Sequence, residues 1–219
     1  MNKPAGYALA VHGGAGTLRR GDMSAEQAGR YHAGLRRALA AGRGVLETGG
    51  GALDAVTEAV AALEDDPLFN AGRGAVFTAA GKQEMDAAVM DGRGRRAGAV
   101  AGIFGPRNPV RAARLVMERT PHVMLAGDGA LALCREHGLE FAEAAYFFTE
   151  QRWRALQQTL AAGCPEATDD EARRHGTVGA VAPRPGGQCR RRDHDRRDDR
   201  QGARAGRRQP DHRRRHLCR

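Results

Sequence analysis

The stretch His175-Gly176-Thr177-Val178-Gly179-Ala180-Val181-Ala182 places a Gly-Thr peptide bond at the head of a short apolar run. The small and β-branched residues after Thr177 predict a buried strand, and the polar residues 169–174 before it are typical of a loop. This is the local layout of a self-cleaving hydrolase precursor, because cleavage before Thr177 would place its hydroxyl beside its own free α-amine, which can act as the base. An ordinary strand after a glycine turn has the same pattern, so this stretch alone does not distinguish a cleavage site from a simple strand start.

Positive charge is concentrated at the end of the chain. The 219 residues carry a net charge of +9, and residues 183–219, with 14 Arg and 5 Asp, account for all of it. Residues 1–182 are therefore neutral overall and have the composition of a globular domain. An argument for nucleic-acid binding from net charge would concern the tail alone, and the tail has no aromatic residue on which a base could stack. We expect no nucleic-acid partner.

The cysteines and the N-terminus exclude several other classes of protein. The four cysteines, Cys134, Cys164, Cys189 and Cys218, form no CxxC pair, so neither a metal cluster nor a redox motif is expected. The first residues lack the long apolar core of a signal peptide, and no apolar run is long enough to span a bilayer. We expect a cytoplasmic protein with no membrane partner.

Helix signals occur in the first half of the chain and again further along. Ser24 followed by Gln27 is a capping box that predicts a helix over 25–47. Asn108-Pro109 predicts the start of another helix, and further helices are expected at 127–137 and 152–160. Four apolar residues at helical spacing predict a helix after Gly51, with that face in the core. They are Leu53, Val56, Val60 and Leu63.

Short runs of small and apolar residues predict strands between the helices. These runs are 7–11, 75–78, 84–91, 97–104, 122–125 and the run after Thr177. Because small and apolar residues dominate 84–91 and 97–104, we expect a sheet that is covered on both faces, and hence an α/β (α+β) fold. His12, His122, His137 and His175 lack metal-ligand spacing and are expected to be surface or loop histidines.

Seven stretches of the chain, taken together and in order, resemble the plant-type L-asparaginase/isoaspartyl peptidase family of N-terminal-nucleophile hydrolases. Two of them are Ala10-Val11-His12-Gly13-Gly14-Ala15-Gly16 and Gly176-Thr177-Val178-Gly179-Ala180-Val181-Ala182. The others are 63–72, 84–92, 97–102, 107–118 and 121–124. The resemblance covers residues 8–182, and it makes Thr177 a strong candidate for the nucleophile.

The resemblance implies an αββα sandwich of which residues 1–182 hold the α-chain half and the first β-chain strand. Self-cleavage between Gly176 and Thr177 would separate the two chains, and the mature form would be a dimer of αβ heterodimers. Thr177 Oγ would then attack the side-chain carbonyl of L-asparagine or of a β-aspartyl (isoaspartyl) dipeptide, while the α-amine of Thr177 takes the proton. Asn70 matches a family residue near the nucleophile. No cofactor is implied for the chemistry.

The resemblance also implies a structural sodium ion in the loop after the second helix. Its ligands would be the backbone carbonyls of Leu63, Glu64, Asp66, Phe69, Ala71 and Arg73. Carbonyl ligation explains why the side chains of such a loop need not be acidic. The alternative is that the loop is only a helix end packed under the site.

The resemblance stops after Ala182, and a shifted reading frame restores it. When each codon is read from its second base, residues 188–199 can encode Asn-Val-Ala-Ala-Ala-Thr-Thr-Thr-Gly-Gly-Met-Thr, and residues 204–218 can encode Gly-Arg-Val-Gly-Asp-Ser-Pro-Ile-Ile-Gly-Ala-Gly-Thr-Tyr-Ala. Both are β-chain motifs of the family, at its distance from Thr177. We therefore interpret residues 183–219 as a disordered, out-of-frame tail caused by one extra base near Ala182-Pro183. The 219-residue chain in its present reading frame, called the written chain below, would be an inactive form. The substrate-binding residues would belong to the missing β chain.

Two alternatives remain open. The first is a glycosylasparaginase-like amidase, which assays on glycosylated asparagine would distinguish. The second is a non-enzymatic scaffold whose Arg-rich tail binds nucleic acid.

Overall fold

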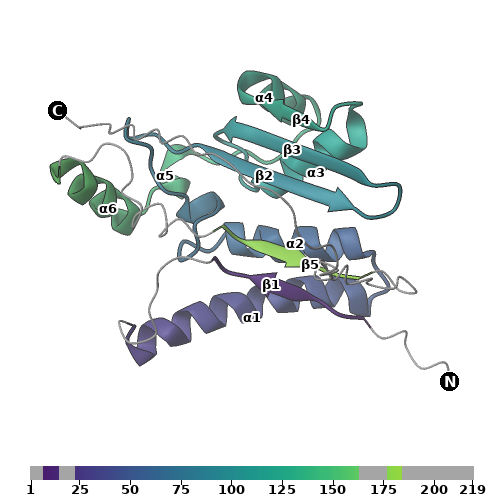
Figure 1. The fold of residues 1–219 in the computed structure, drawn as a ribbon, viewed down its shortest axis with the longest axis horizontal. Helices are drawn as coiled ribbons and strands as arrows, with labels where there is room; N and C mark the ends of the chain where they lie inside the picture. Colours follow the sequence, from purple (N-terminus) through teal and green to yellow (C-terminus); the bar gives the residue numbers. More distant parts are fainter. Residues whose placement is uncertain (1–6, 15–22, 163–176, 184–219) are drawn as a thin grey trace, which may run out of the picture. The chain divides into compact units, whose positions relative to one another are not determined.

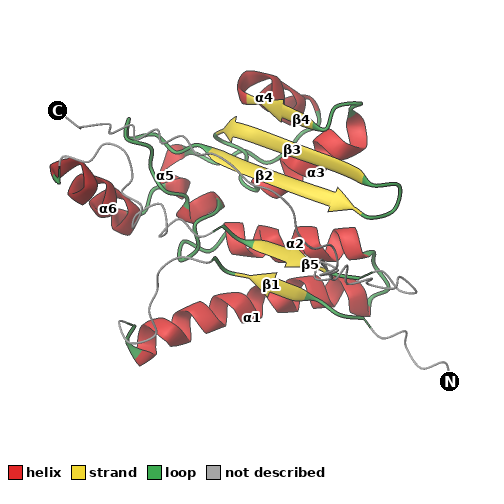
Figure 2. Ribbon diagram, in the orientation of Figure 1, coloured by secondary structure: helices red, strands yellow, loops and turns green. Residues whose placement is uncertain are grey.

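The computed structural model describes residues 7–14, 23–162 and 177–183. All of them belong to one compact unit, Met1–Gln188. They form a mixed α/β fold in which helices pack on two small sheets (Figures 1 and 2). The expected disordered tail lies outside the described residues apart from Pro183.

Helices α1 (Ala25–Glu47) and α2 (Ala52–Glu64) pack against each other (Figure 1). The predicted capping box is present, because Ser24 Oγ accepts a hydrogen bond from Gln27 N–H at 3.1 Å and Gln27 Oε1 accepts one from Ser24 N–H at 3.0 Å. Gly42 permits the close approach of the helices, since a Cβ there would lie 2.7 Å from the carbonyl oxygen of Ala55. The prediction of a helix over 25–47 is confirmed.

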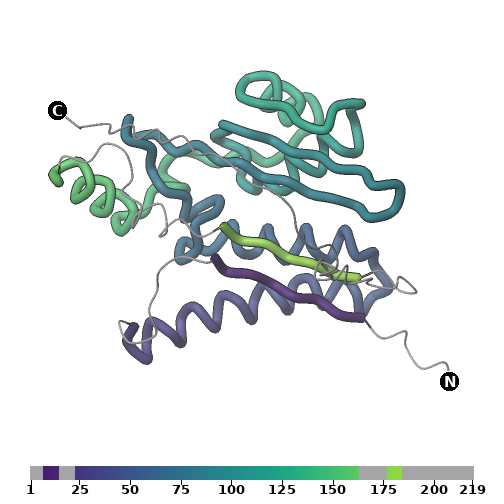
Figure 3. Tube along the Cα trace, viewed as in Figure 1, coloured from purple at the N-terminus to yellow at the C-terminus, as the bar shows by residue number. Residues whose placement is uncertain are grey.

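The smaller sheet joins the two ends of the described chain. Strand β1 (Ala10–His12) pairs antiparallel with β5 (Gly179–Val181), so that Ala10 lies opposite Val181 and His12 opposite Gly179. Figure 3 shows β5, drawn in yellow-green, beside β1, drawn in purple. Helices α1 and α2 contact this sheet.

The larger sheet has the strand order β2-β3-β4. Strands β2 (Met85–Asp91) and β3 (Arg96–Ile103) are antiparallel, and β4 (Met124–Ala126) runs parallel to β3. Helices α3 (Pro109–Arg119) and α4 (Gly127–Glu136) pack on it, and α3 lies so close to Gly98 that a Cβ there would collide with the carbonyl oxygen of Ala113. The main core lies here and includes Val89, Val100, Ile103, Val116, Met117 and Cys134.

The last described helices support the loop between α2 and β2. They are α5 (Ala144–Phe147), which the sequence analysis missed, and α6 (Glu150–Ala161). The loop itself contains the 3₁₀ turn η1 (Gly72–Gly74). The strand predicted at 75–78 is wrong, since only an isolated bridge between Phe77 and Gln83 forms there. The buried Gln83 amide instead donates to the carbonyl oxygens of Ala75 and Phe147 at 2.8 and 3.1 Å.

Three expectations about burial are corrected by the structure. The strand after Thr177, β5, was predicted to be buried, but it is only partly buried and Val181 is 69% exposed. The larger sheet is not covered on both faces by the described residues, because Met90 on β2 is 64% exposed. The buried side of α2 carries Ala55, Ala59 and Leu63, whereas Val56 and Val60, which were predicted to be core, are only partly buried and line a cavity. Within the described residues, no helix combines the length and the apolar character needed to cross a bilayer.

Candidate functional site

Thr177 lies at the entrance to β5. It is exposed and stands two residues before the first residue of that strand. Because β5 pairs with β1, Thr177 is held near the end of β1, where the Nδ1 atom of His12, the last residue of that strand, lies 3.0 Å from the Thr177 carbonyl oxygen. His12 is exposed, as expected of a surface histidine, but its contact with Thr177 was not predicted. Gly176 and His175 lie outside the described residues.

Asn70 lies in the loop between α2 and η1, and its side chain closes that loop. Asn70 Oδ1 accepts a hydrogen bond from the backbone N–H of Val76 at 3.0 Å. A second tie comes from α6, where Arg152 Nε donates to the carbonyl oxygen of Gly74 at 2.9 Å. The amide nitrogen of Asn70 has no partner among the described residues, so this donor remains available to a ligand.

Thr177 and Asn70, which are 107 positions apart in the sequence, line the same cavity of about 540 Å³. Its walls come from α2, the Asn70 loop, β2 and residues 177–181. Most of the wall is apolar, and the charged residues on it are Glu64, Glu84 and Asp86; none of the described residues lining it is basic. The structure thus brings together the two residues predicted to act in catalysis.

Glu64 is a buried carboxyl group on the wall of this cavity. It is 3% exposed, and its Oε1 accepts a hydrogen bond from the backbone N–H of Val110 at 2.9 Å. Its Oε2 has no partner among the described residues. Burial raises the pKa of Glu64 to about 8, because the charged form is poorly solvated there.

The expected sodium ligands lie in a tightly folded loop that begins at the end of α2. Gly72 has a φ of 50° and sits so close to Glu64 that a Cβ would collide with the Glu64 carbonyl oxygen. Gly74 is packed in the same way against the carbonyl oxygen of Phe69. The backbone at these two glycines therefore lies directly against the carbonyl oxygens of Glu64 and Phe69. The six expected ligands are Leu63, Glu64, Asp66, Phe69, Ala71 and Arg73.

Three of these carbonyl oxygens already accept a backbone N–H, those of Leu63, Asp66 and Ala71, at 3.2, 3.2 and 3.0 Å. A carbonyl oxygen has a second lone pair, so such a bond leaves room for a cation. In the part of the chain that the structure describes, no group of three or more His, Cys, Asp or Glu side chains is placed to hold a metal ion.

A polar cluster holds the end of α2 in place. Asp65 Oδ1 accepts hydrogen bonds from Tyr146 Oη at 2.7 Å and from Arg107 Nε at 3.1 Å. Burial alone would raise the pKa of Asp65, but the hydrogen bonds from Tyr146, Arg107 and Asn108 outweigh burial and hold that pKa below its usual range. The guanidinium groups of Arg73 and Arg107 both lie against the Tyr146 ring, at 5.3 and 5.2 Å from its centroid. The cluster therefore ties the Asn70 loop to α5 and to the start of α3.

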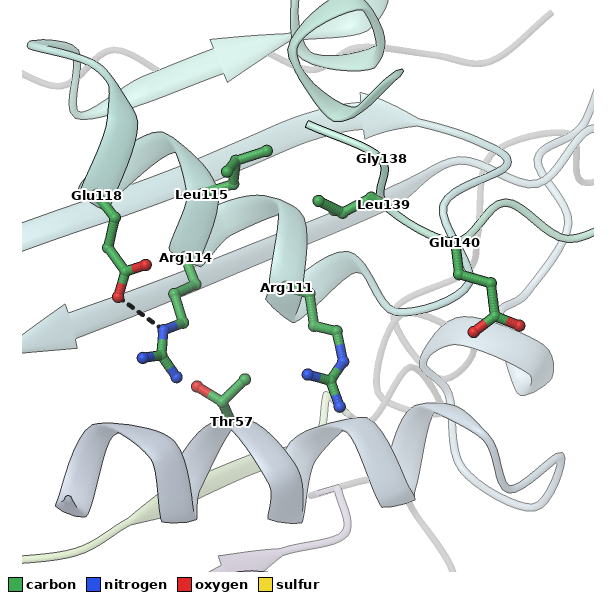
Figure 4. A pocket seen from close by; sticks show the side chains of 8 residues that line it. All are labelled: Thr57, Arg111, Arg114, Leu115, Glu118, Gly138, Leu139 and Glu140. Carbon is green, nitrogen blue, oxygen red and sulfur yellow. Dashed lines mark hydrogen bonds and ion pairs between the residues drawn. The ribbon is translucent and has the colours of Figure 1, made fainter. Parts of the chain in front are cut away.

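A second cavity, of about 430 Å³, lies between α2 and α3 (Figure 4). Arg111 and Arg114 point into it from α3, but each guanidinium already has a carboxylate partner. Arg111 pairs with Glu58 at 2.9 Å, and Arg114 pairs with Asp54 and Glu118. This cavity contains neither Thr177 nor Asn70 and shows no free charge for a ligand.

Comparison with known proteins finds similar sequences over most of the chain. A family model described as Asparaginase matches residues 5–188. An isoaspartyl peptidase of Salmonella typhimurium is 48% identical over 188 residues, which cover 83% of this chain and 59% of that protein. A plant-type L-asparaginase of Pyrococcus abyssi is 46% identical over 156 residues, covering 71% of this chain and 50% of that protein. An isoaspartyl peptidase/L-asparaginase of Homo sapiens is 42% identical over 174 residues, covering 80% and 55%. The chain spans little more than half the length of these relatives.

Proposed function

The chain belongs to the asparaginase family, and we propose that it represents a self-cleaving, threonine-nucleophile amidohydrolase that acts on L-asparagine and β-aspartyl dipeptides. The observation that carries the proposal is the shared cavity of Thr177 and Asn70. The names of the similar proteins support the substrate class. The αββα sandwich and the dimer of αβ heterodimers belong to the same proposal.

Maturation begins at the peptide bond between Gly176 and Thr177. Thr177 Oγ attacks the carbonyl carbon of Gly176, and the acyl group moves from the nitrogen of Thr177 to its oxygen. Water then hydrolyses the ester, which leaves a carboxylate on Gly176 and a free α-amine on Thr177. The exposure of Thr177 supports this step, because both the hydroxyl and water need access to the bond.

The mature reaction uses the same hydroxyl. Thr177 Oγ attacks the side-chain carbonyl carbon of the substrate, and the α-amine of Thr177 takes the hydroxyl proton and passes it to the leaving amine. Ammonia leaves from asparagine, and an amino acid leaves from a β-aspartyl dipeptide. Water then releases aspartate from the ester. The free amide N–H of Asn70 is suited to hold an oxygen on the acyl group.

A sodium ion in the loop from Leu63 to Arg73 would hold the Asn70 segment in place. The carbonyls of Leu63, Glu64, Asp66, Phe69, Ala71 and Arg73 would bind it. The ion would fix the backbone of this loop, as hard cations held by oxygen ligands do.

We place the substrate-binding residues and the remaining oxyanion donors in the half of the protein that only the alternative reading frame would encode. The cavity wall of described residues contains no basic group to bind the α-carboxylate of the substrate. Exposed apolar residues, Met90 at 64% and Val181 at 69%, support a further layer of strands over this region. In the alternative frame, residues 188–199 and 204–218 can encode two β-chain motifs of the family, which supports the proposal that the written form is an inactive, frameshifted version.

The test is to express the gene with one base removed near the Ala182 codon. Mass spectrometry should find a fragment that begins with Thr177, and the Thr177→Ala variant should stay uncut. The cleaved protein should release ammonia from asparagine and aspartate from β-aspartyl dipeptides. Turnover of glycosylated asparagine alone would favour the glycosylasparaginase-like alternative, and cleavage before residue 177 in Thr177→Ala would contradict the proposal.

A further inference from the structure

The side chain of His12 continues the contact between β1 and β5 beyond their last backbone pair. The ladder ends where His12 lies opposite Gly179, two residues short of Thr177. From there the imidazole spans the gap, with Nδ1 3.0 Å from the Thr177 carbonyl oxygen. The same nitrogen lies 3.2 Å from the backbone nitrogen of Gly14.

These two contacts require opposite states of the ring. Nδ1 donates to a carbonyl oxygen only when it carries a proton, and it accepts from an N–H only when it does not. If Nδ1 were unprotonated, its lone pair would face the lone pairs of the Thr177 carbonyl oxygen at 3.0 Å, and the two atoms would repel each other. If Nδ1 carries the proton, the N–H of Gly14 loses its acceptor, but both contacts are exposed and water can accept from that N–H. The balance favours the protonated nitrogen.

We propose that His12 is a positioning residue that donates a hydrogen bond from Nδ1 to the Thr177 carbonyl and so fixes the residue that carries the nucleophile. The proposal rests on the proposed function of Thr177. The bond holds the backbone on the C-terminal side of Thr177, which restricts where its Oγ and its nitrogen can lie. His12 itself touches neither substrate nor the reacting atoms.

The segment that carries His12 also contacts the Asn70 loop. A Cβ on Gly13 would lie 2.8 Å from Cε1 of Phe69, so the backbone at Gly13 lies directly on the ring of the residue before Asn70. The short segment that contains His12 and Gly13 therefore contacts both Thr177 and the Asn70 loop. Because a displacement of about 1 Å can cost about 10²-fold in rate, a tie of this kind at the nucleophile has kinetic consequences.

The first experiment measures the tautomer in the full 219-residue chain. The chain is labelled with ¹⁵N in its imidazole rings, and the His12 signals are assigned by their loss in His12→Asn. Spectra are taken at about pH 8.5, well above the ordinary imidazole pKa of about 6.5, so that neutral rings are observed. We expect the proton of His12 on Nδ1. A proton on Nε2 alone would overturn the proposal, and this measurement needs no catalytic activity.

The second experiment uses the gene with its frame restored. His12→Leu should slow the appearance of the Thr177 fragment by about tenfold, and should lower the kcat of mature protein without raising KM, as loss of one positioning bond predicts. His12→Asn, whose side-chain amide can donate from a similar position, should recover most of the rate. His32→Leu, at an exposed histidine of α1, is the matched control and should not change it.

The outcomes separate the two proposals. If the unmutated protein does not cleave before Thr177, the proposed function fails, whatever the tautomer of His12. If it cleaves and His12→Leu cleaves equally fast with an equal thermal midpoint, only the role of His12 fails. A slow His12→Leu that His12→Asn does not rescue, although both fold with normal midpoints, would also overturn the hydrogen-bond role.

Discussion

Oε1 of Glu64 accepts a hydrogen bond from the backbone N–H of Val110 at 2.9 Å, so the last residue of α2 caps the first turn of α3. The N–H groups in the first turn of a helix have no partner inside it, and a side chain of another element here supplies one. Since the Asn70 loop begins at Glu64, the bond also ties this loop to a helix that packs on the larger sheet.

Replacing Glu64 should show how much its acceptor oxygen contributes to stability. Glu64→Gln keeps an oxygen that can accept from Val110 and should change the free energy of unfolding by less than about 1 kcal/mol. Glu64→Ala leaves the Val110 N–H buried without an acceptor and should cost about 1–3 kcal/mol. Urea unfolding measures both. On the same helix, Glu58→Ala removes an exposed ion pair and should cost less than about 1 kcal/mol. Equal stability of Glu64→Ala and Glu58→Ala would contradict the capping role.

Arg152 should matter more than its neighbour Arg154, although both are arginines on α6. Arg152 Nε donates to the carbonyl oxygen of Gly74, burial lowers the pKa of its guanidinium, and no carboxylate pairs with it among the described residues. Arg154 is exposed and pairs with Glu150 one turn away. Arg152→Lys loses the planar Nε donor and should cost about 1–2 kcal/mol in urea unfolding, whereas Arg154→Lys should stay within about 0.5 kcal/mol. The same cost for both variants would show that the Gly74 contact contributes nothing.

The helices and the main strand pair could be predicted from the sequence because their signals are local. The Ser24–Gln27 capping box and Asn108-Pro109 mark helix starts at residues 25 and 109, where α1 and α3 begin. The strand predicted at 75–78 does not form. The carbonyl oxygen of Ala75 instead accepts a hydrogen bond from the buried Gln83 side chain, a contact that the local sequence does not reveal. The buried side of α2 was predicted wrongly, because apolar residues at helical spacing do not indicate which side of the helix packs against α1.

The candidate site was predicted in part. Thr177 and Asn70 were predicted from the resemblance; the structure shows that they line one cavity, and their catalytic roles stay a prediction. The contact of His12 with Thr177 was missed, because an isolated histidine without metal-ligand spacing carries no local signal and the β1–β5 pairing spans almost the whole described chain. The buried carboxyl of Glu64 was missed for the same reason, since its partner Val110 lies 46 positions away.

Cys134 should be unreactive in the folded chain. It is 1% exposed, and burial raises the pKa of its thiol, so less of the reactive thiolate is present at any given pH than in a free cysteine. In a variant with Cys164, Cys189 and Cys218 changed to Ser, a chromogenic disulfide reagent should label Cys134 only slowly at neutral pH and rapidly in denaturing urea. Labelling at the rate of free cysteine without denaturant would contradict the packing of α4 on the larger sheet.

Sodium should stabilise the frame-restored protein through the loop from Leu63 to Arg73. Exchanging sodium chloride for tetramethylammonium chloride at equal ionic strength should lower the thermal midpoint and the asparaginase activity together, because the large organic cation cannot enter a cage of carbonyls. Gly72→Ala, which forces a Cβ into the Glu64 carbonyl, should abolish the difference between the two salts. Identical midpoints in both salts for the unmutated protein would argue against a cation in this loop.

The written chain should release no ammonia from asparagine above background, whereas the version with one base removed near the Ala182 codon should do so. Thr177 and Asn70 line the cavity, but no basic residue on its described wall can hold the α-carboxylate of the substrate. The missing half would also supply the oxyanion donors, and the loss of even one such donor typically costs about 10²–10³ in kcat. The exposed apolar side chains of Met90 and Val181 should make the written chain more prone to aggregation than the restored one, which light scattering can compare. Comparable ammonia release per mole by the two proteins would refute both the frameshift and the roles assigned to the missing half.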